Sequence, residues 1–327
     1  MKVLVTGATG FVGTALLQRL SSEDGCSVRA SVRNAGALLG CGIEQTVVPD
    51  VGPESQWQEA LAGCDVVVHL AARVHVMRDK NADPLAEFRR VNTHGTANLA
   101  RQAAIAGVQR LVFVSSIKVN GEVTAPGRAF KPDDRPDPQD AYAVSKHEAE
   151  IALRELAAAS VGQASVGMEV VIVRPPLVYG PGVKGNLSSL LCALSNSALL
   201  PLGAIHNQRS FIALGNLVDL LVYCMRYPMA GNQTFLASDG HDLSTTELIQ
   251  RLASALGKPA RLIKVPSWLL KLGATVIGKR AEAQRLCGNL QVDISKARDL
   301  LGWVPPVDVD DGLRMTAVDY LNDLHKS

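Results

Sequence analysis

Short apolar runs alternate with longer segments in which apolar residues recur at helical spacing through the first half of the chain. Runs of this length are typical of buried parallel strands, and the longer segments are typical of helices that cover a sheet. We expect strands at 2–8, 27–33, 43–48, 65–71, 110–116 and 168–174, and helices at 13–20, 55–61, 83–107 and 141–159. This alternation predicts an α/β fold with a doubly wound parallel sheet.

The alternation stops after residue 175, where a stretch rich in proline and glycine leads into shorter helices separated by loops. We therefore expect residues 1–175 to form the sheet. Residues 176–327 are expected to form a smaller mixed α/β lobe over the ligand edge of that sheet. A segment near 210–240 is expected to return to the first part.

Composition narrows the possible partners. The 327 residues are 47% hydrophobic and only 4% aromatic, and 33 basic and 31 acidic side chains leave a formal net charge of +2. The chain lacks the basic stripe that follows a phosphate backbone, so we expect no nucleic-acid partner.

The cysteines are far apart and form no CxxC pair, so we expect no metal site and interpret them as buried thiols in a reducing cytoplasm. They are Cys26, Cys41, Cys64, Cys192, Cys224 and Cys287.

No apolar run approaches the ~18 residues of a membrane-spanning helix, and the N-terminal run is too short for a signal peptide. We therefore expect a cytoplasmic protein without membrane insertion. Residues 268–270 and 276–277 flank Lys271 and lead into Lys279 and Arg280. This pattern suits either an interfacial helix or an amphipathic helix packed on the core, and we favour the core-packed helix.

The first strand ends in Gly7-Ala-Thr-Gly-Phe-Val-Gly13, and a helix follows at once. Strand, glycine turn and helix is the arrangement in which backbone N–H groups bind a pyrophosphate. The spacing is GxxGxxG, and the alternative is a tight turn without a ligand. We favour dinucleotide binding, with contacts from Gly7, Thr9, Gly10, Phe11, Val12 and Gly13.

Arg33 stands at the end of the second strand, 20 residues after Gly13, where an acidic residue would accept the ribose hydroxyls of NAD. A guanidinium there suits the 2′-phosphate of NADP, so NADP(H) is favoured and NAD(H) stays possible. The alternative is an exposed arginine that simply ends a strand.

The strand at 65–71 ends in small residues that would let a cofactor approach the backbone. His69 lies inside this strand, and we interpret it as a core histidine rather than a base. The further cofactor contacts that we expect are Asp50, Val51, Leu70, Ala71, Ala72, Asn92 and Pro175.

Tyr142 and Lys146 are four residues apart in a helical segment, so the phenol and the ammonium lie on one face, where the cation would favour the phenolate. On spacing alone an ordinary surface pair is favoured, and it is the sequence upstream of this pair that supports a catalytic role. Ser115 and Ser116 end the fifth strand, at the edge where such sheets bind ligands. The loop at 118–140, which follows, is long enough to suggest a functional role.

Six motifs occur in the order and approximate spacing of one family: Gly7-Ala-Thr-Gly-Phe-Val-Gly13, His69-Leu-Ala-Ala72, Ser116, Tyr142 with Lys146, Arg174-Pro-Pro-Leu-Val-Tyr-Gly180, and Ser295 to Pro305. The chain resembles the extended short-chain dehydrogenase/reductases, the NAD(P)-dependent nucleotide-sugar epimerase, dehydratase and reductase group, whose sheet is a Rossmann fold. The resemblance implies that Tyr142 is the acid/base at a sugar oxygen. It also implies that Lys146 lowers the pKa of Tyr142 and binds the nicotinamide ribose, and that Ser116 binds the same sugar oxygen.

Departures from the family pattern narrow the activity. Ile117 and Lys118 stand where 4,6-dehydratases carry an acidic pair, so we discount water elimination. Lys118 and Arg33 both favour a reductase. We expect a UDP-sugar 4-keto reductase that makes a UDP-QuiNAc or UDP-FucNAc type of product for a surface polysaccharide such as O-antigen. The alternative is a UDP-hexose or UDP-N-acetylhexosamine 4-epimerase.

The second lobe is similar to that of UDP-sugar enzymes. Asn186, Leu187 and Arg209 resemble positions that face the substrate diphosphate, and Lys118 and Ser116 are expected near the sugar. For Arg209 the alternative is a surface salt bridge. For Arg285, phosphate binding and a salt bridge are equally supported.

A third hypothesis is a non-catalytic sensor that binds NADP and a partner protein. Such a sensor needs the glycine turn but not Tyr142, so the intact catalytic set argues against it. The resemblance also implies a homodimer that pairs helices 85–106 and 141–158. The sequence does not specify the sugar or the stereochemistry at C4.

Overall fold

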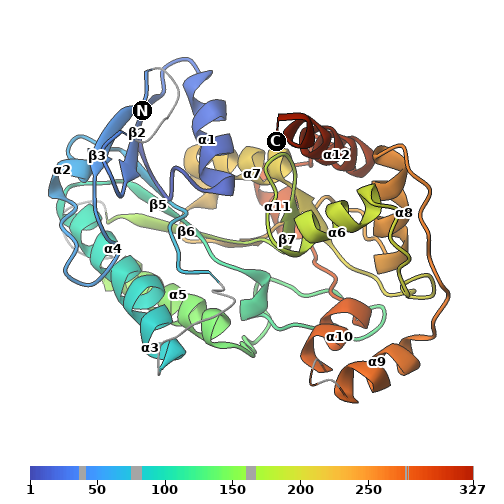
Figure 1. Cartoon of the computed structure of the whole chain (residues 1–327). Coiled ribbons are helices and arrows are strands. Elements are labelled where there is room, and N and C mark those ends of the chain that lie inside the picture. The colour runs from blue at the N-terminus through green and yellow to red at the C-terminus, as the bar shows by residue number, and fades with distance from the viewer. Residues whose placement is uncertain (37–41, 75–82, 160–166, 277, 279, 327) are drawn as a thin grey trace.

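The computed structural model describes residues 1–327 except 37–41, 75–82, 160–166, 277, 279 and 327. Its centre is a seven-stranded sheet in the order β3-β2-β1-β4-β5-β6-β9, and every pair of neighbouring strands is parallel (Figure 1). The strands are β1 (Lys2–Thr6), β2 (Ser27–Val32), β3 (Glu44–Val47), β4 (Val66–His69), β5 (Arg110–Val114), β6 (Glu169–Arg174) and β9 (Thr234–Leu236).

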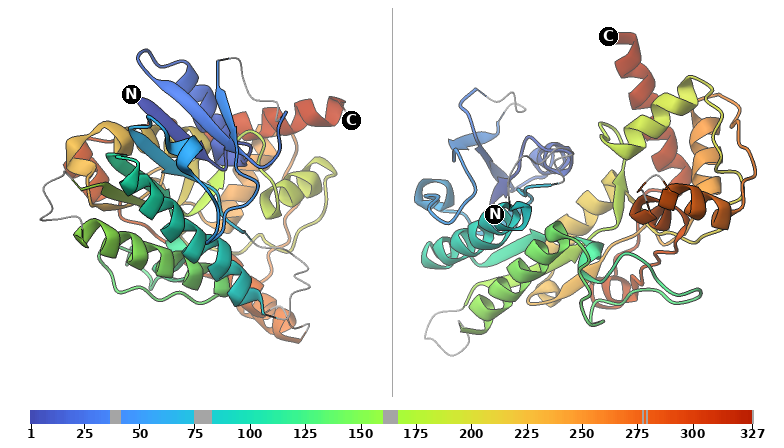
Figure 2. Two further views of the ribbon diagram at one scale, coloured as in Figure 1. Left: turned by 90° about the vertical axis from the view of Figure 1, so that its left-hand side faces the viewer. Right: turned by 60° about the horizontal axis from the view of Figure 1, so that its bottom comes forward.

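Helices cover both faces of the sheet. Successive residues of β1 alternate between the faces: Val3 and Val5 pack against one helical layer, and Leu4 packs against the other. The first layer contains α1 (Phe11–Ser21), α7 (Leu214–Arg226) and α11 (Ser295–Leu301). The second contains α2 (Gln58–Leu61), α4 (Thr96–Ile105) and α5 (Ala141–Ala159), of which α4 and α5 run side by side (Figure 2). The doubly wound α/β architecture predicted from the sequence is therefore confirmed.

The helix expected at 83–107 is interrupted by a wide turn. It consists of α3 (Pro84–Phe88), the π-helix η1 (Arg89–Gly95) and α4. Gly95 lies against the loop after β3, and a Cβ on Gly95 would come within 2.9 Å of the Val51 carbonyl oxygen. The π-helical turn and a small residue thus let this helix contact the 51–52 backbone closely.

The second lobe surrounds its own apolar core. A two-stranded parallel sheet of β7 (Leu177–Tyr179) and β8 (Phe211–Ala213) packs against three helices, α6 (Asn186–Ser195), α8 (Thr245–Ala255) and α12 (Val309–Lys326). The helices α9 (Ser267–Val276) and α10 (Arg280–Cys287) pack on each other at the periphery of this lobe (Figure 1). Two short 3-10 helices, η2 (Ile117–Val119) and η3 (Pro228–Ala230), complete the described elements.

The chain crosses between the two parts more than once. After β8, α7 packs against α1, and β9 then pairs with β6 as the last strand of the large sheet. Later, α11 packs against β9. Residues distant in sequence therefore complete both the sheet and its helical cover.

Two expectations about side-chain burial are wrong. Cys192 is exposed, so not every cysteine is a buried thiol; the five described cysteines are free, and Cys41 lies outside the described residues. Helix α9 does not pack on the core, because Trp268 and Leu272 are exposed. Ile277, which belongs to the apolar pattern expected of this segment, lies outside the described residues. No helix in the described part of the chain is long and apolar enough to cross a membrane.

A buried ion pair joins α5 to the sheet. Glu150 of α5 is completely buried, and its two oxygens accept hydrogen bonds from Arg174 of β6 at 2.8 and 2.5 Å. The hydroxyl of Ser115, after β5, donates to the same carboxylate at 2.6 Å. Arg174 also donates to Asn120 Oδ1 and to the Pro132 carbonyl, which fixes the loop between β5 and α5.

The charge of Glu150 is well compensated. Burial raises the pKa of Glu150, but the hydrogen bonds and charge of Arg174 outweigh that effect and hold the pKa below its usual value. The pair therefore stabilises the fold at neutral pH, and this stabilisation is lost as the pH falls through the folded-state pKa.

We expect Glu150→Gln to lower the free energy of unfolding by about 3–5 kcal/mol, because it leaves the Arg174 guanidinium buried without a counter-charge. Urea unfolding at neutral pH, followed by circular dichroism, measures the loss. Glu148→Gln is the matched control on the same helix. Glu148 pairs with Arg89 in a partly exposed position, so its loss should cost only about 0–1 kcal/mol. Equal losses in the two variants would contradict this account.

Candidate active site

The glycine turn brings the backbones of β1, α1 and β4 into close contact. Gly7 has a φ of 67°, and a Cβ there would lie 2.7 Å from the Ala71 nitrogen. A Cβ on Gly13 would lie 2.2 Å from the Gly7 carbonyl oxygen. Gly10 precedes α1 and is exposed, and no side chain caps this helix. The turn therefore leaves the N-terminus of α1 open to an anion, as a bound pyrophosphate requires.

Arg33 is exposed beyond the end of β2, near Asp50. Arg90 of η1 donates to the Asp50 carboxylate at 2.5 Å. This hydrogen bond, with a smaller contribution from the charge of Arg33, lowers the pKa of Asp50. Asp50 thus stays ionised, and the positive charge of the arginines offsets its negative charge. Its carboxylate would therefore repel a cofactor phosphate less strongly.

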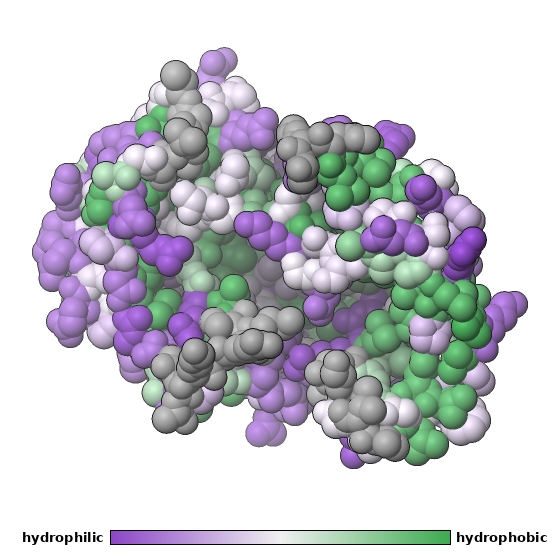
Figure 3. Space-filling model, in the orientation of Figure 1, coloured by the Kyte–Doolittle hydropathy of each residue, from purple (hydrophilic) through white to green (hydrophobic). Residues whose placement is uncertain are grey.

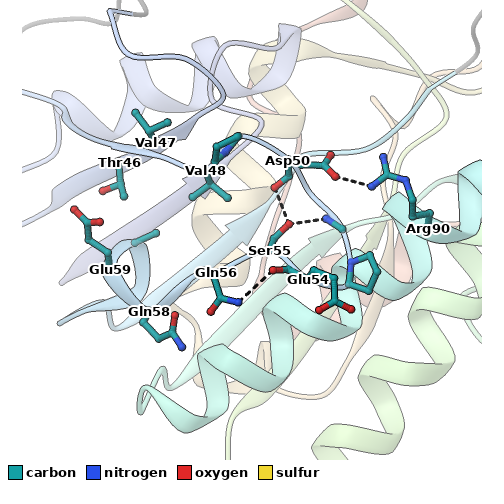
Figure 4. A pocket seen from close by; sticks show the side chains of 14 residues that line it. Thr46, Val47, Val48, Asp50, Glu54, Ser55, Gln56, Gln58, Glu59 and Arg90 are labelled. Atoms are coloured by element: carbon teal, nitrogen blue, oxygen red, sulfur yellow. Dashed lines mark hydrogen bonds and ion pairs between the residues drawn. The ribbon is translucent and has the colours of Figure 1, made fainter.

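Asp50 and Arg90 also line a cavity of about 730 Å³ beside β3 and α2 (Figure 4). Its other lining residues come from 46–60, and neither Tyr142 nor Lys146 is among them. The cavity therefore lies apart from the predicted catalytic pair.

The residues that follow β4 lie beside the glycine turn, and the polar side chain at the end of the strand has hydrogen-bond partners. Leu70, Ala71 and Ala72 are partly buried beside the glycine turn. His69 is fully buried, with hydrogen bonds to Thr6 Oγ1 at 2.7 Å and to Thr96 Oγ1 at 3.0 Å. Burial, and then the charge of Lys146, lowers the pKa of His69 to about 3. His69 is therefore a neutral core histidine, as the sequence predicted.

Asn92 lies in the π-helical turn and is buried. Its side-chain oxygen accepts from the Arg73 backbone at 2.8 Å, and its amide donates to the Arg73 carbonyl and to Ser145 Oγ, both at 3.0 Å. Ser145 stands between Tyr142 and Lys146 on α5. Asn92 therefore holds the chain after β4 against the catalytic helix.

Tyr142 lies in the first turn of α5, and its ring meets the Phe88 ring edge to face at 6.1 Å. Burial, and then the negative charge of Asp140, raises the pKa of Tyr142 to about 12. Asp140 caps this helix, because the Ala143 N–H donates to its Oδ1 at 2.8 Å. The protein alone therefore keeps the phenol protonated at neutral pH.

Lys146 is buried one turn after Tyr142, and its Nζ lies 4.0 Å from the centre of the Phe113 ring of β5. A cation over an aromatic face is attracted by the ring. Burial lowers the pKa of Lys146 to about 7, although the charge of Glu150 opposes this shift. Neither Phe113 nor Glu150 was singled out from the sequence.

Ser116 follows β5 and begins the short helix η2. Its Oγ accepts from the Lys118 backbone N–H at 3.3 Å. The next residue, Ile117, donates its N–H to the Pro175 carbonyl at 3.0 Å, so the ends of β5 and β6 are held together at this edge. The structure therefore places Ser116 and Pro175 at the carboxyl edge of the sheet.

The predicted substrate residues Lys118, Arg209 and Arg285 meet in one charged network with two carboxylates. Lys118 Nζ lies 2.6 Å from Asp140 Oδ2. Arg285 of α10 makes two hydrogen bonds to Glu122, at 2.6 and 3.0 Å, and lies 3.5 Å from Asp140. Arg209 is not in a surface salt bridge; it donates to the Arg285 carbonyl at 2.5 Å. This network links the loop between β5 and α5 to the second lobe.

The other two predicted substrate residues begin α6. Asn186 is exposed, and Leu187 is buried in the apolar core of the second lobe beside Tyr179. The molecular surface is hollowed between the sheet and the second lobe, which is the region that the two parts enclose (Figure 3). Among the described residues, no group of three or more histidine, cysteine or carboxylate side chains could hold a metal ion.

Comparison with known proteins agrees with this geometry. The model of the NAD dependent epimerase/dehydratase family matches residues 3–237. A Vibrio cholerae protein named UDP-glucose 4-epimerase is 47% identical over 325 residues, covering 98% of this chain and 95% of that protein. An Escherichia coli O157:H7 protein is 29% identical over 96% of this chain and 93% of its own length. It is named N-acetyl-alpha-D-glucosaminyl-diphospho-ditrans,octacis-undecaprenol 4-epimerase.

A solved structure shares the fold. The UDP-glucuronic acid 4-epimerase of Bacillus cereus, in complex with NAD, superposes with a TM-score of 0.78 at 21% identity, covering 100% of this chain and 98% of the other. The resemblance inferred from the sequence motifs is therefore confirmed. By the family model, the close Vibrio relative and the shared fold, the chain belongs to the NAD dependent epimerase/dehydratase family.

Proposed function

We propose that the protein is a 4-epimerase that inverts the C4 hydroxyl of a UDP-hexose or UDP-N-acetylhexosamine. The observation that carries this proposal is the position of Tyr142 and Lys146, one turn apart on α5, a helix that packs against η2, where Ser116 is the N-cap, and that places Lys146 over Phe113 of β5. The 47% identical relative named as a UDP-glucose 4-epimerase supports epimerisation over the reductase expected from the sequence.

The open turn at Gly7, Gly10 and Gly13 fits a dinucleotide pyrophosphate, and the backbone of Leu70 and Ala71 lies beside it. Pro175 lies at the carboxyl edge of the sheet, where it would complete the cofactor site. When bound, the nicotinamide supplies the hydride exchange at C4. Lys146 would bind its ribose, and Asn92 would maintain the adjoining backbone through its bonds to Arg73.

Tyr142 Oη takes the proton of the C4 hydroxyl and later returns it, while Ser116 Oγ donates a hydrogen bond to the same oxygen. This requires the phenolate, but burial and Asp140 hold the pKa of Tyr142 near 12. A positive charge close to Tyr142 must therefore lower its pKa in the working complex. Lys146 is the chain's own cation on that helix face, and it keeps its proton best when Glu150 is ionised.

We assign substrate binding to the segments of 176–327 that adjoin the charged network. Arg209 and Arg285 are fixed near each other, as bidentate recognition of a diphosphate requires. Both named relatives act on sugars attached to a phosphate-containing carrier, which is consistent with this assignment. Asn186 stands exposed at the start of α6, where its backbone can add a donor.

A second candidate is the UDP-sugar 4-keto reductase. Arg33 favours it, because an exposed guanidinium beside Asp50, whose negative charge is offset, suits NADP, which a reductase would exchange at every turnover. The two candidates differ in cofactor behaviour. An epimerase regenerates NAD in place, whereas a reductase consumes NADPH or NADH in proportion to product.

Purified protein is expected to interconvert UDP-glucose and UDP-galactose, or the corresponding N-acetyl sugars, without added cofactor. Tyr142→Phe should lower this rate by about 10²–10⁴-fold, because it removes the proton acceptor. Tyr227→Phe, at the exposed tyrosine that follows α7, should leave the rate unchanged. Chromatography of the sugar nucleotides measures turnover. Stoichiometric NADPH oxidation with a 4-keto sugar, and no epimerisation, would instead establish the reductase.

We expect Asp140→Asn to shift the acidic limb of kcat/KM to lower pH. The negative charge of Asp140 raises the pKa of Tyr142, so neutralising it lowers that pKa and preserves the base to lower pH. Asparagine keeps the helix cap, so α5 should stay folded. Asp137→Asn, in the same loop but exposed, is the control and should not move the profile. A shift in the opposite direction would refute this role of Asp140.

Arg33→Ala is expected to weaken NADPH binding by about tenfold or more and to leave NADH binding unchanged, because only the 2′-phosphate loses a charge-assisted contact. Titration of the bound nicotinamide fluorescence measures both affinities. Arg128→Ala, at an exposed loop arginine, controls for the general loss of one positive charge. Equal affinities of the parent protein for NADPH and NADH would remove the proposed NADP preference.

A further inference from the structure

The segment from Lys258 to Arg280 is strongly basic in a chain that is nearly neutral overall. It contains six basic residues and no acidic one, whereas the whole chain has a formal net charge of +2. The basic residues are Lys258, Arg261, Lys264, Lys271, Lys279 and Arg280. Lys258, Arg261, Lys264 and Lys271 are exposed. Such a cluster attracts an anionic surface.

Helix α9, in the middle of this segment, presents its large apolar side chains to solvent. Trp268 is 65% exposed, Leu269 44% and Leu272 56%. The partly buried positions of α9 are Ser267, Leu270 and Ala274, so Leu270 is the one leucine of this helix that is turned partly toward the protein. The usual amphipathic arrangement, with the bulky apolar residues toward the protein, is therefore absent here.

The exposed apolar residues form one surface. Trp268 and Leu272 are four residues apart, so they lie on the same side of the helix, and Leu269 adjoins them. Ile263, which is 45% exposed, precedes the helix. Figure 3 shows hydrophobic side chains gathered along the edge of the second lobe. We call Ile263, Trp268, Leu269 and Leu272 the α9 surface. Large exposed apolar groups of this kind mark interaction sites.

The lysines next to the α9 surface decide what it binds. Lys264 precedes the helix, and Lys271 stands one turn from Trp268. In an interfacial helix the apolar side chains enter the boundary between headgroups and acyl chains, while long basic side chains reach the lipid phosphates. A symmetric contact between two copies would instead bring two basic, acid-free segments together, which like-charge repulsion disfavours.

We propose that the α9 surface is a peripheral membrane-binding site that takes the surface of a bilayer containing anionic lipids. The side chains of Trp268, Leu269 and Leu272 insert shallowly, and Lys264 and Lys271 pair with lipid phosphates. The site lies on the second lobe, beside the Arg285 helix α10, so binding holds the hollow between the two parts close to the membrane. Membrane binding determines where the enzyme acts, and it does not depend on which sugar the enzyme converts.

Flotation of the full-length protein with vesicles tests the site. The protein should float with vesicles of phosphatidylglycerol and phosphatidylethanolamine, and far less with vesicles of phosphatidylcholine alone. The double variant Trp268→Ser/Leu272→Ser should lose most of the binding. Lys264→Gln/Lys271→Gln should weaken it by roughly fivefold for each lysine removed, and added salt should have the same effect.

The matched control is Val318→Ser/Leu324→Ser, which removes two similarly exposed apolar side chains from α12. It should bind vesicles as the parent does. Circular dichroism and analytical ultracentrifugation of each variant report folding and oligomeric state. No flotation of the parent with anionic vesicles, or equal loss in the α12 control, would overturn the proposal. So would a change of oligomeric state in the α9 variant with vesicle binding intact, because the surface would then join copies of the chain.

Discussion

The buried carboxylate of Glu150 is the constraint on which the catalytic region depends. A charge in this position is tolerated only if its partners are fixed, and they come from three directions: Ser115 after β5, Arg174 at the end of β6, and Arg154 one turn further along α5. Ser115 and Arg174 can reach Glu150 only when α5 lies against the ends of β5 and β6. The same carboxylate favours the positive charge of Lys146. Glu150 therefore both holds α5 on the sheet and sets the charge of the lysine beside Tyr142.

Periodicity predicted the sheet and its helical layers well, because buried parallel strands and covering helices follow directly from the spacing of apolar residues. It also placed Tyr142 and Lys146 on the correct helix, whereas Ser116, expected at the end of the fifth strand, lies just beyond β5 and begins η2. It did not predict the π-helical turn at 89–95, because that turn depends on the close approach of Gly95 to Val51, a tertiary contact with no local signal. The burial of α9 was mistaken for a related reason. Apolar spacing identifies a helix face but not what covers it.

The partners of the charged side chains also could not be predicted from the sequence. Lys118 and Arg285 are separated by more than half of the chain, yet both meet Asp140. Asp140 in turn caps the helix that begins with Tyr142. Tyr142, the proposed acid/base residue, and Arg285 of the second lobe are therefore electrostatically coupled through one carboxylate. Any ligand that draws Arg285 or Lys118 away from Asp140 changes the field at the phenol, so binding and proton transfer are linked.

The return of the chain to the large sheet has a consequence for how the protein is made. Strand β9, which pairs with β6, and helix α7, which covers α1, are synthesised only after β7, α6 and β8. Until then, the edge of β6 and the apolar stripe of α1 have no cover. The nucleotide-binding half is thus an incomplete body on the ribosome until residue 236 has emerged. A gene fragment cut at the apparent boundary near 175 would encode a piece with an open sheet edge, prone to aggregation rather than to independent folding.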